Sequence, residues 1–117
     1  MNERGHEERR ATTEALFRDV NERIAKSAEH FDATHTEFVC ECSDPNCIDR
    51  VAASLAEYEE VRDEPTTFLV APGHEESDIE RVISDRGRFR IVDKVQQMVR
   101  RTVVRLDPRD RPASSGS

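Results

Sequence analysis

Apolar side chains in the first third of the chain recur at the spacing of an amphipathic α-helix. Five of them lie three or four residues apart: Phe17, Val20, Ile24, Ala28 and Phe31. We expect this helix to begin near Thr12 and to pack its apolar stripe on the core. A coiled-coil seam with a second copy is the alternative, although the stripe is shorter than the roughly 3–4 heptads typical of coiled coils. The charged residues 1–11 before it have little to bury and are expected to fray.

The middle of the chain changes to patterns typical of strands, interrupted by one short helix. Alternation of apolar and polar residues predicts a strand at Thr36–Cys40. Ser54 then opens a capping box with Glu57, so a short helix is predicted over residues 55–63. The apolar run Thr66–Val70 predicts a second strand that is largely buried.

The last third of the chain predicts a hairpin and a final helix. Residues 79–84 and 89–92 are rich in Val, Ile and Phe and flank a turn, which favours two antiparallel strands. A short helix over 75–84 is the competing interpretation. From Lys94 onward, apolar positions recur at helical spacing and predict a terminal helix.

The order of these elements predicts the class of fold. Helix, strand, helix, strands and helix are typical of an α+β domain, with a small antiparallel sheet at its centre. The chain of 117 residues is too short for two ordinary domains, so we expect one domain over residues 12–106. A disordered tail is expected at 107–117, where proline, serine and arginine replace apolar residues.

Composition limits the size of the core and the kind of partner. Hydrophobic residues make up 35% and charged residues 37%, so a small core supports a highly charged surface, and a bound metal would help to stabilise it. The net charge of −7 argues against general attraction to nucleic acid or to anionic membranes. Residues 36–93 carry 15 acidic and 6 basic residues, whereas residues 94–117 carry 2 acidic and 6 basic ones. This split fits a protein partner, self-association, or a basic segment lying on the acidic part of its own chain.

The cysteines are the strongest chemical signal, because all three fall within eight residues, at Cys40, Cys42 and Cys47. Thiolates so close together, with a Ser-Asp-Pro-Asn turn between the last two, suit a soft tetrahedral ion such as zinc. The fourth ligand has to come from elsewhere in the chain. His74, which follows Pro-Gly at the end of the second predicted strand, is the first candidate, and His35 is the second. A nearby carboxylate or a water molecule is the remaining option.

Other chemistry at the cysteine cluster leads to different predictions. A redox site would need an exposed thiol of low pKa and a partner for a disulfide, and Cys40 is better placed to pair with Cys47 than with Cys42. A zinc hydrolase would need an open coordination position and a nearby base, for which Glu41 and Glu76 are candidates. No Ser/His/Asp order or glycine-rich phosphate loop supports another enzyme class.

Basic residues gather in the C-terminal part of the chain and could meet phosphate groups. They are Lys94, Arg100, Arg101, Arg105, Arg109 and Arg111. Nucleic-acid binding through this segment is the alternative function. It is disfavoured because the segment lacks interleaved aromatic residues and the rest of the chain is acidic.

The cysteine count and the hydropathy pattern predict a cytoplasmic protein. Three cysteines cannot all pair within one chain, and the charged start Met1–Arg4 shows no apolar signal segment. No apolar run approaches the roughly 20 residues of a membrane-spanning helix, so no membrane association is expected.

Three stretches resemble an uncharacterised family of small bacterial proteins: Phe38–Cys47 (FVCECSDPNC), Leu55–Arg62 (LAEYEEVR) and Phe68–His74 (FLVAPGH). Members of that family also begin with a helix similar to Glu14–Ile24, and the resemblance covers roughly residues 14–94. Its most specific parts are the cysteine trio and the Pro-Gly-His motif. The resemblance implies that the three cysteines and His74 act together, and it implies no established activity.

These observations together predict a zinc-stabilised domain whose metal is structural. We expect it to act in the cytoplasm as a protein-interaction or regulatory module, without catalysis of its own. The expected partner is another protein or a second copy of the chain.

Overall fold

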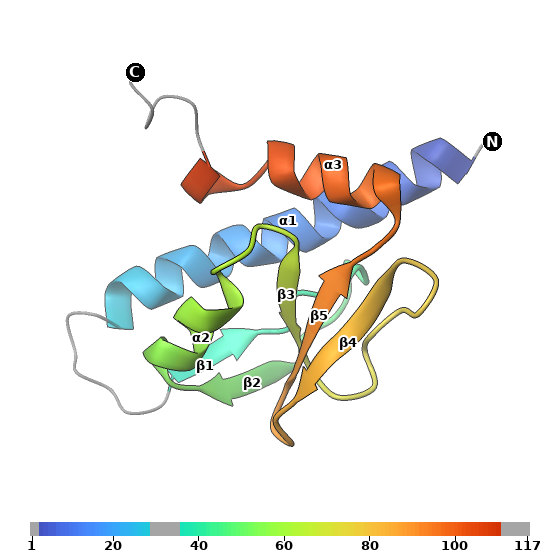
Figure 1. Ribbon diagram of the computed structural model, residues 1–117. Coiled ribbons are helices and arrows are strands. Elements are labelled where there is room, and N and C mark those ends of the chain that lie inside the picture. The colour runs from blue at the N-terminus through green and yellow to red at the C-terminus, as the bar shows by residue number, and fades with distance from the viewer. Residues whose placement is uncertain (1–2, 29–35, 111–117) are drawn as a thin grey trace.

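The computed structural model describes residues 3–28 and 36–110 and has the α+β architecture expected from the sequence (Figure 1). Its elements in chain order are α1 (Glu3–Ala28), β1 (Thr36–Val39), β2 (Arg50–Ala53), α2 (Leu55–Val61), β3 (Thr67–Val70), β4 (Glu80–Asp85), β5 (Arg90–Lys94), α3 (Gln97–Arg105) and the short 3₁₀ helix η1 (Pro108–Asp110). The three predicted helices and the predicted strands are therefore present in the described part of the chain.

The strands form two small antiparallel sheets rather than the single sheet expected. β1 pairs with β2, and β5 lies between β3 and β4 in the second sheet. The β4–β5 hairpin confirms the predicted antiparallel strands, and the competing helix over residues 75–84 is wrong. A backbone hydrogen bond links the two sheets: the Glu41 N–H donates to the Leu69 carbonyl at 2.8 Å. The cysteine loop thus leaves one sheet, and the Pro-Gly-His segment leaves the other.

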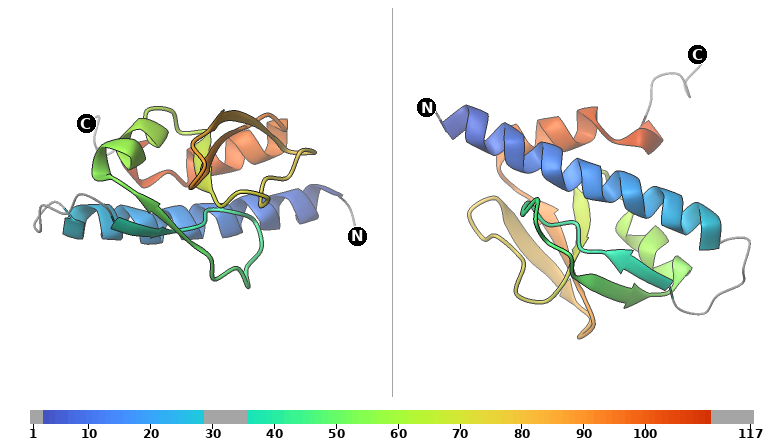
Figure 2. Two further views of the ribbon diagram at one scale, coloured as in Figure 1. Left: turned by 90° about the horizontal axis from the view of Figure 1, so that it is seen from below. Right: turned by 180° about the vertical axis from the view of Figure 1, so that it is seen from behind.

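α1 runs along one side of both sheets and lies beside α3 (Figures 1 and 2). It packs against α3 and β1. The helix begins at Glu3, earlier than the predicted start near Thr12, and Arg10 within the added turns donates to Asp78 at 2.9 Å. None of the described helices is both long and apolar enough to cross a membrane.

The buried face of α1 agrees only in part with the one its apolar pattern predicted, because Ile24 packs against the core as expected. The side chains it buries are small or polar: Ala11, Glu14, Ala15, Arg18, Asn21, Ala25 and Ala28. Within the predicted stripe Ala28 is buried, but Val20 is 36% exposed, and the neighbouring Leu16 is 62% exposed. Phe31 lies outside the described residues. The surface beneath α1 presents charged groups and backbone amides, and buried groups of that kind need polar partners rather than an apolar stripe.

The apolar core is formed by the two sheets together with residues from all three helices. Phe38 of β1 stacks on Tyr58 of α2, with ring centroids 4.6 Å apart. The predicted capping box is confirmed, because Glu57 N–H donates to the Ser54 hydroxyl and Ser54 N–H donates to the Glu57 carboxylate. The buried Tyr58 hydroxyl donates to Glu22 of α1 at 2.6 Å. These contacts fix α2 against both β1 and α1.

The segment after α3 is held on the body of the protein. Asp107 is buried and pairs with Arg62 at 2.5 Å, and Arg109 pairs with Glu22 at 2.7 Å. The first residues of the expected tail, 107–110, thus make ion pairs with the domain and include the 3₁₀ helix η1. Residues 111–117 lie outside the described residues.

Candidate metal centre

The three cysteines converge because of the way the chain turns after β1. Alternation along the extended chain puts Cys40 and Cys42 on one side and directs Glu41 to the other. The turn that follows is closed by a hydrogen bond from the Cys47 N–H to the Asp44 carbonyl, 3.0 Å long, which brings the third thiol back to the first two. All three cysteines are free thiols.

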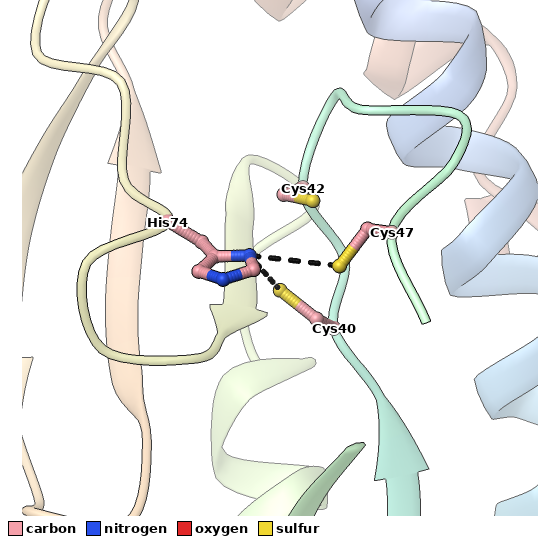
Figure 3. A group of neighbouring side chains, drawn as sticks. All are labelled: Cys40, Cys42, Cys47 and His74. Atoms are coloured by element: carbon pink, nitrogen blue, oxygen red, sulfur yellow. Dashed lines mark hydrogen bonds between the residues drawn. The ribbon is translucent and has the colours of Figure 1, made fainter. Parts of the chain in front are cut away.

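His74 reaches this cluster from the second sheet (Figure 3). It follows a tight turn in which its N–H donates to the Ala71 carbonyl at 3.0 Å, and Gly73 adopts a φ of +89°, which a side chain would strain. The His74 Nδ1 atom lies 3.5 Å from the Sγ atoms of both Cys40 and Cys47. The structure therefore brings together the four side chains selected from the sequence.

The spacing between His74 and two of the cysteines, Cys40 and Cys47, fits a tetrahedral metal ion. The ligand atoms of all four side chains, three sulfurs and one imidazole nitrogen, lie within 4.8 Å of one another. With Zn–S bonds of about 2.3 Å and Zn–N bonds of about 2.0–2.1 Å, tetrahedral geometry puts sulfur and nitrogen about 3.6 Å apart and two sulfurs about 3.8 Å apart. The observed sulfur-to-nitrogen distances of 3.5 Å match this value. These residues can hold a metal ion.

Backbone N–H groups point at the sulfurs. The Ala71 N–H donates to the Cys40 sulfur at 3.2 Å, and the peptide groups of Asp44 and Asp49 donate to the other two sulfurs. Such hydrogen bonds stabilise the thiolate, which is the form that binds metals. The loop thus supplies both the ligands and the groups that stabilise their charge.

The thiols strongly influence one another's ionisation. The hydrogen bond from Cys40 lowers the pKa of Cys42 to about 5. The same hydrogen bond, together with burial, raises the pKa of Cys40, and burial raises the pKa of Cys47. Three negative sulfurs are thus unfavourable at this spacing without a cation, whereas a bound divalent ion would allow all three to ionise.

Asp49 orients the imidazole of His74. The Nε2 atom lies 2.9 Å from the Asp49 carboxylate, so Nδ1 is directed at the sulfurs. A carboxylate that holds the remote nitrogen in this way fixes the tautomer and ring direction of a metal-binding histidine. Hydrogen bonding to Cys42 raises the pKa of His74, as expected for a ring beside negative groups.

The two carboxylates considered as catalytic bases have other partners. Glu41 is fully buried and accepts hydrogen bonds from the Asn21 side chain at 2.8 Å and the Leu69 N–H at 3.0 Å. Glu76 accepts a hydrogen bond from the Ser43 hydroxyl at 2.6 Å and pairs with an arginine of α1. Both carboxylates therefore serve the packing around the site.

The remaining histidines lie away from this group or outside the described chain. His6 is exposed on α1. His35, the second candidate for the fourth ligand, lies outside the described residues, as does His30. Of the histidines that the structure describes, His74 is the one that joins the cysteines.

Most of the C-terminal basic side chains are paired with acidic groups of the same chain. The pairs are Lys94 with Glu14 and Glu80, Arg100 with Asp93, Arg105 with Glu8, and Arg109 with Glu22 and Glu59. Arg101 alone, among the described residues of this basic segment, makes no ion pair, and Arg111 lies outside them. The basic segment thus lies on acidic groups of its own chain, one of the arrangements expected from the charge distribution.

In addition to the cysteine cluster, the structure contains a buried cluster of charged side chains beneath α1, which sequence reasoning missed. The Lys94 ammonium is fully buried, 2.8 Å from the Glu14 carboxylate and paired with Glu80. It also lies 4.7 Å from the centre of the Phe68 ring, and the Arg18 guanidinium lies 3.6 Å from the same centre. The available signal was a second set of positions in α1 at three- and four-residue spacing, occupied by alanines and polar residues.

Comparisons with protein-family models, with curated proteins and with solved structures found no match for this chain. The resemblance to a family with a Cys-x-Cys-x4-Cys cluster therefore stays a prediction.

Proposed function

We propose that Cys40, Cys42, Cys47 and His74 bind one zinc ion and that this zinc is structural. The observation that carries the proposal is the convergence of three sulfurs and one imidazole nitrogen within 4.8 Å. Four protein ligands complete the coordination of zinc, as in structural sites, whereas catalytic sites leave a position for water. The sulfur-rich donor set favours zinc over magnesium or calcium, which prefer oxygen.

The zinc ion would link the loop after β1 to the loop after β3, and so fix the position of the two sheets relative to each other. Hydrogen bonds such as that from Ser43 to Glu76 already join the two loops. Binding of structural zinc contributes on the order of 10 kcal/mol to the folding of small zinc peptides. A chain with only 35% hydrophobic residues would gain much of its stability in this way.

The rest of the proposed function follows from this structural role. We infer a protein-interaction or regulatory module of the cytoplasm without catalytic activity, since the two nearby carboxylates are used in packing and the thiols suit a reducing compartment. The expected partner is a protein or a second copy. The alternative of nucleic-acid binding gains no support, because most of the described basic side chains of the C-terminal segment are paired internally.

The experiment that tests the metal site is X-ray absorption on the purified chain, combined with metal analysis. We expect one zinc per chain, with three sulfur ligands and one nitrogen ligand. His74→Ala should lose the nitrogen ligand and weaken binding, while His35→Ala, the matched control, should leave both unchanged. Absence of stoichiometric metal, or loss of the nitrogen ligand in His35→Ala alone, would contradict the assignment.

A further inference from the structure

α1 holds the cysteine loop through one buried side chain. The Asn21 amide donates to the Val39 carbonyl and accepts from the Val39 N–H, both at 2.8 Å, and it donates to the Glu41 carboxylate at 2.8 Å. Val39 directly precedes Cys40, and Glu41 separates Cys40 from Cys42. A single fully buried residue of α1 thus fixes the backbone that aims two of the metal ligands.

α1 also holds the loop that carries the histidine. The Arg10 guanidinium donates to Asp78 at 2.9 and 3.1 Å and pairs with Glu76, two residues after His74. Glu76 in turn accepts from the hydroxyl of Ser43, which lies in the cysteine loop. Arg10 is therefore linked to both ligand-bearing loops through one chain of hydrogen bonds.

Further polar contacts join α1 to the sheets, beside the apolar contacts of Ala11, Ile24 and Ala25 with the core, so its position depends in part on specific partners. Glu14 reaches the buried ammonium of Lys94, and Arg18 donates to the Pro65 carbonyl at 2.7 Å. Between these residues the helix buries alanines, which contribute little apolar area. An interface of this kind loses much of its stability when its polar partners shift, because each buried polar group then lacks a hydrogen bond.

We propose that metal binding at the Cys40, Cys42, Cys47 and His74 site is coupled to the docking of α1, so that loss of the metal releases the helix from the sheets. This inference rests on the proposed zinc site and adds its regulatory output. Metal binding fixes the two loops with which Asn21 and Arg10 form hydrogen bonds. These hydrogen bonds in turn order the loops and so favour metal binding. Coupling between two sites is reciprocal: α1 strengthens metal binding by the same factor by which the metal strengthens docking.

The functional consequence is a surface that changes with metal supply. With metal bound, α1 covers the polar groups around Lys94 and Phe68. Without it, the inner face of α1 and the sheet surface beneath become available to a protein partner. The outer face of α1, where Leu16 is 62% exposed, is accessible in both states and does not report on the metal.

The first arm of the test measures zinc affinity of the full chain by competition with a chromophoric chelator. Typical coupling energies correspond to about 5- to 150-fold in affinity, and we expect Asn21→Ala to weaken zinc binding at least about tenfold. Arg10→Ala, whose side chain is nearer the surface and less prone to disturb folding, should weaken it about fivefold. Arg23→Ala is the matched control, because Arg23 lies on α1 with its side chain 81% exposed and should change affinity less than about twofold.

The second arm compares hydrogen exchange of the wild-type chain with zinc and after chelation. We expect amides of α1 to exchange at least about tenfold faster without metal, while those of the β4–β5 hairpin change less. Equal affinity of Asn21→Ala, Arg10→Ala and Arg23→Ala for zinc would overturn the coupling. So would an equal loss of protection in α1 and the hairpin, because metal loss would then unfold the domain as a whole.

These outcomes distinguish the two proposals. Uniform unfolding on chelation leaves the structural zinc site intact as a proposal and removes the coupling alone. A wild-type chain that binds no zinc removes both.

Discussion

Two groups of ionisable side chains lie close to α1, and their charges are balanced differently. In the carboxylate cluster, Glu14 and Glu80 share the buried ammonium of Lys94, so the chain supplies its own cation. In the sulfur cluster, the cysteines raise or lower one another's pKa, and the groups beside them are backbone N–H groups and the His74 imidazole, with no Lys or Arg among the described contacts. The first cluster is complete within the chain, whereas the second requires a cation from solution. The charge balance of the first cluster is thus set by the chain itself, and that of the second depends on metal concentration.

Removal of the metal should produce the largest effect. Chelation of the wild-type protein, or Cys40→Ser, should lower the free energy of unfolding by several kcal/mol, with about 10 kcal/mol as the value known for small zinc peptides. The reason is that binding of the metal contributes to folding, and that three negative sulfurs are unfavourable at this spacing without a cation. Thermal melting with and without chelator measures the change, and chelator should have no further effect on Cys40→Ser. An unchanged melting curve after complete metal removal would contradict the difference between the two clusters.

Loss of the internal cation should be the next largest effect. Lys94→Met leaves two buried carboxylates without their partner, which costs about 3–5 kcal/mol for a broken buried ion pair. Urea unfolding measures the loss, and the triple variant that adds Glu14→Gln and Glu80→Gln should recover most of it. If Lys94→Met were as stable as the wild type, the buried cluster would not contribute as described.

The pH dependence of stability should single out Glu14. Burial raises the pKa of Glu14 from 4.5 to about 7, and the charge of Lys94 opposes the shift. Between these two values the folded state binds more protons than the unfolded state, so this group makes stability fall as pH rises from about 4.5 to 7. Glu14→Gln removes that contribution, on the order of 2–3 kcal/mol across the window.

Urea unfolding of wild type and variant at pH 5 and pH 7.5 checks this expectation. The contributions of the metal ligands are common to both proteins and cancel in the comparison. Glu8→Gln, at an exposed position of the same helix, is the control and should follow the wild-type profile. Identical profiles for Glu14→Gln and wild type would place the titration of Glu14 near its ordinary pKa.

The smallest effect should come from the residue that orients the histidine. Asp49→Asn weakens the contact to the His74 Nε2 atom, and changes to such supporting groups typically reduce metal affinity about tenfold or more. Zinc affinity measured by chelator competition should fall by about this factor, with little change in melting temperature at saturating zinc. Asp63→Asn, at an exposed position away from the metal site, is the control.

The two clusters also show what sequence reasoning could reach. The cysteines are neighbours in the sequence, and the Pro-Gly turn before His74 marks a ligand at a strand end, so the group of four was predictable. The capping box at Ser54 and the β4–β5 hairpin were predictable for the same reason, since their signals lie within a few residues. Each depends on local geometry that short patterns determine.

The burial of α1 could not be predicted in this way. Its apolar residues suggested an inward stripe, but Val20 of that stripe is exposed and the polar Asn21 is fully buried. That choice depends on Lys94, the Val39 backbone and Glu41, which lie on other elements and are visible only in three dimensions. The division of the strands into two sheets likewise depends on packing that no short pattern contains.

The ion pairs that fix α1 also set the order in which the protein can assemble during synthesis. Lys94 lies 80 residues after Glu14, and Arg109 lies 87 residues after Glu22. α1 therefore leaves the ribosome long before its partners exist, and at about 5–20 residues per second the wait lasts roughly 4–16 s. The inner face of this helix is made of alanine, glutamate, arginine and asparagine, so it exposes little hydrophobic surface that could aggregate during that time. The polar inner face makes the orientation of α1 hard to predict from the sequence. The same face is compatible with exposure to solvent before the rest of the chain has been made.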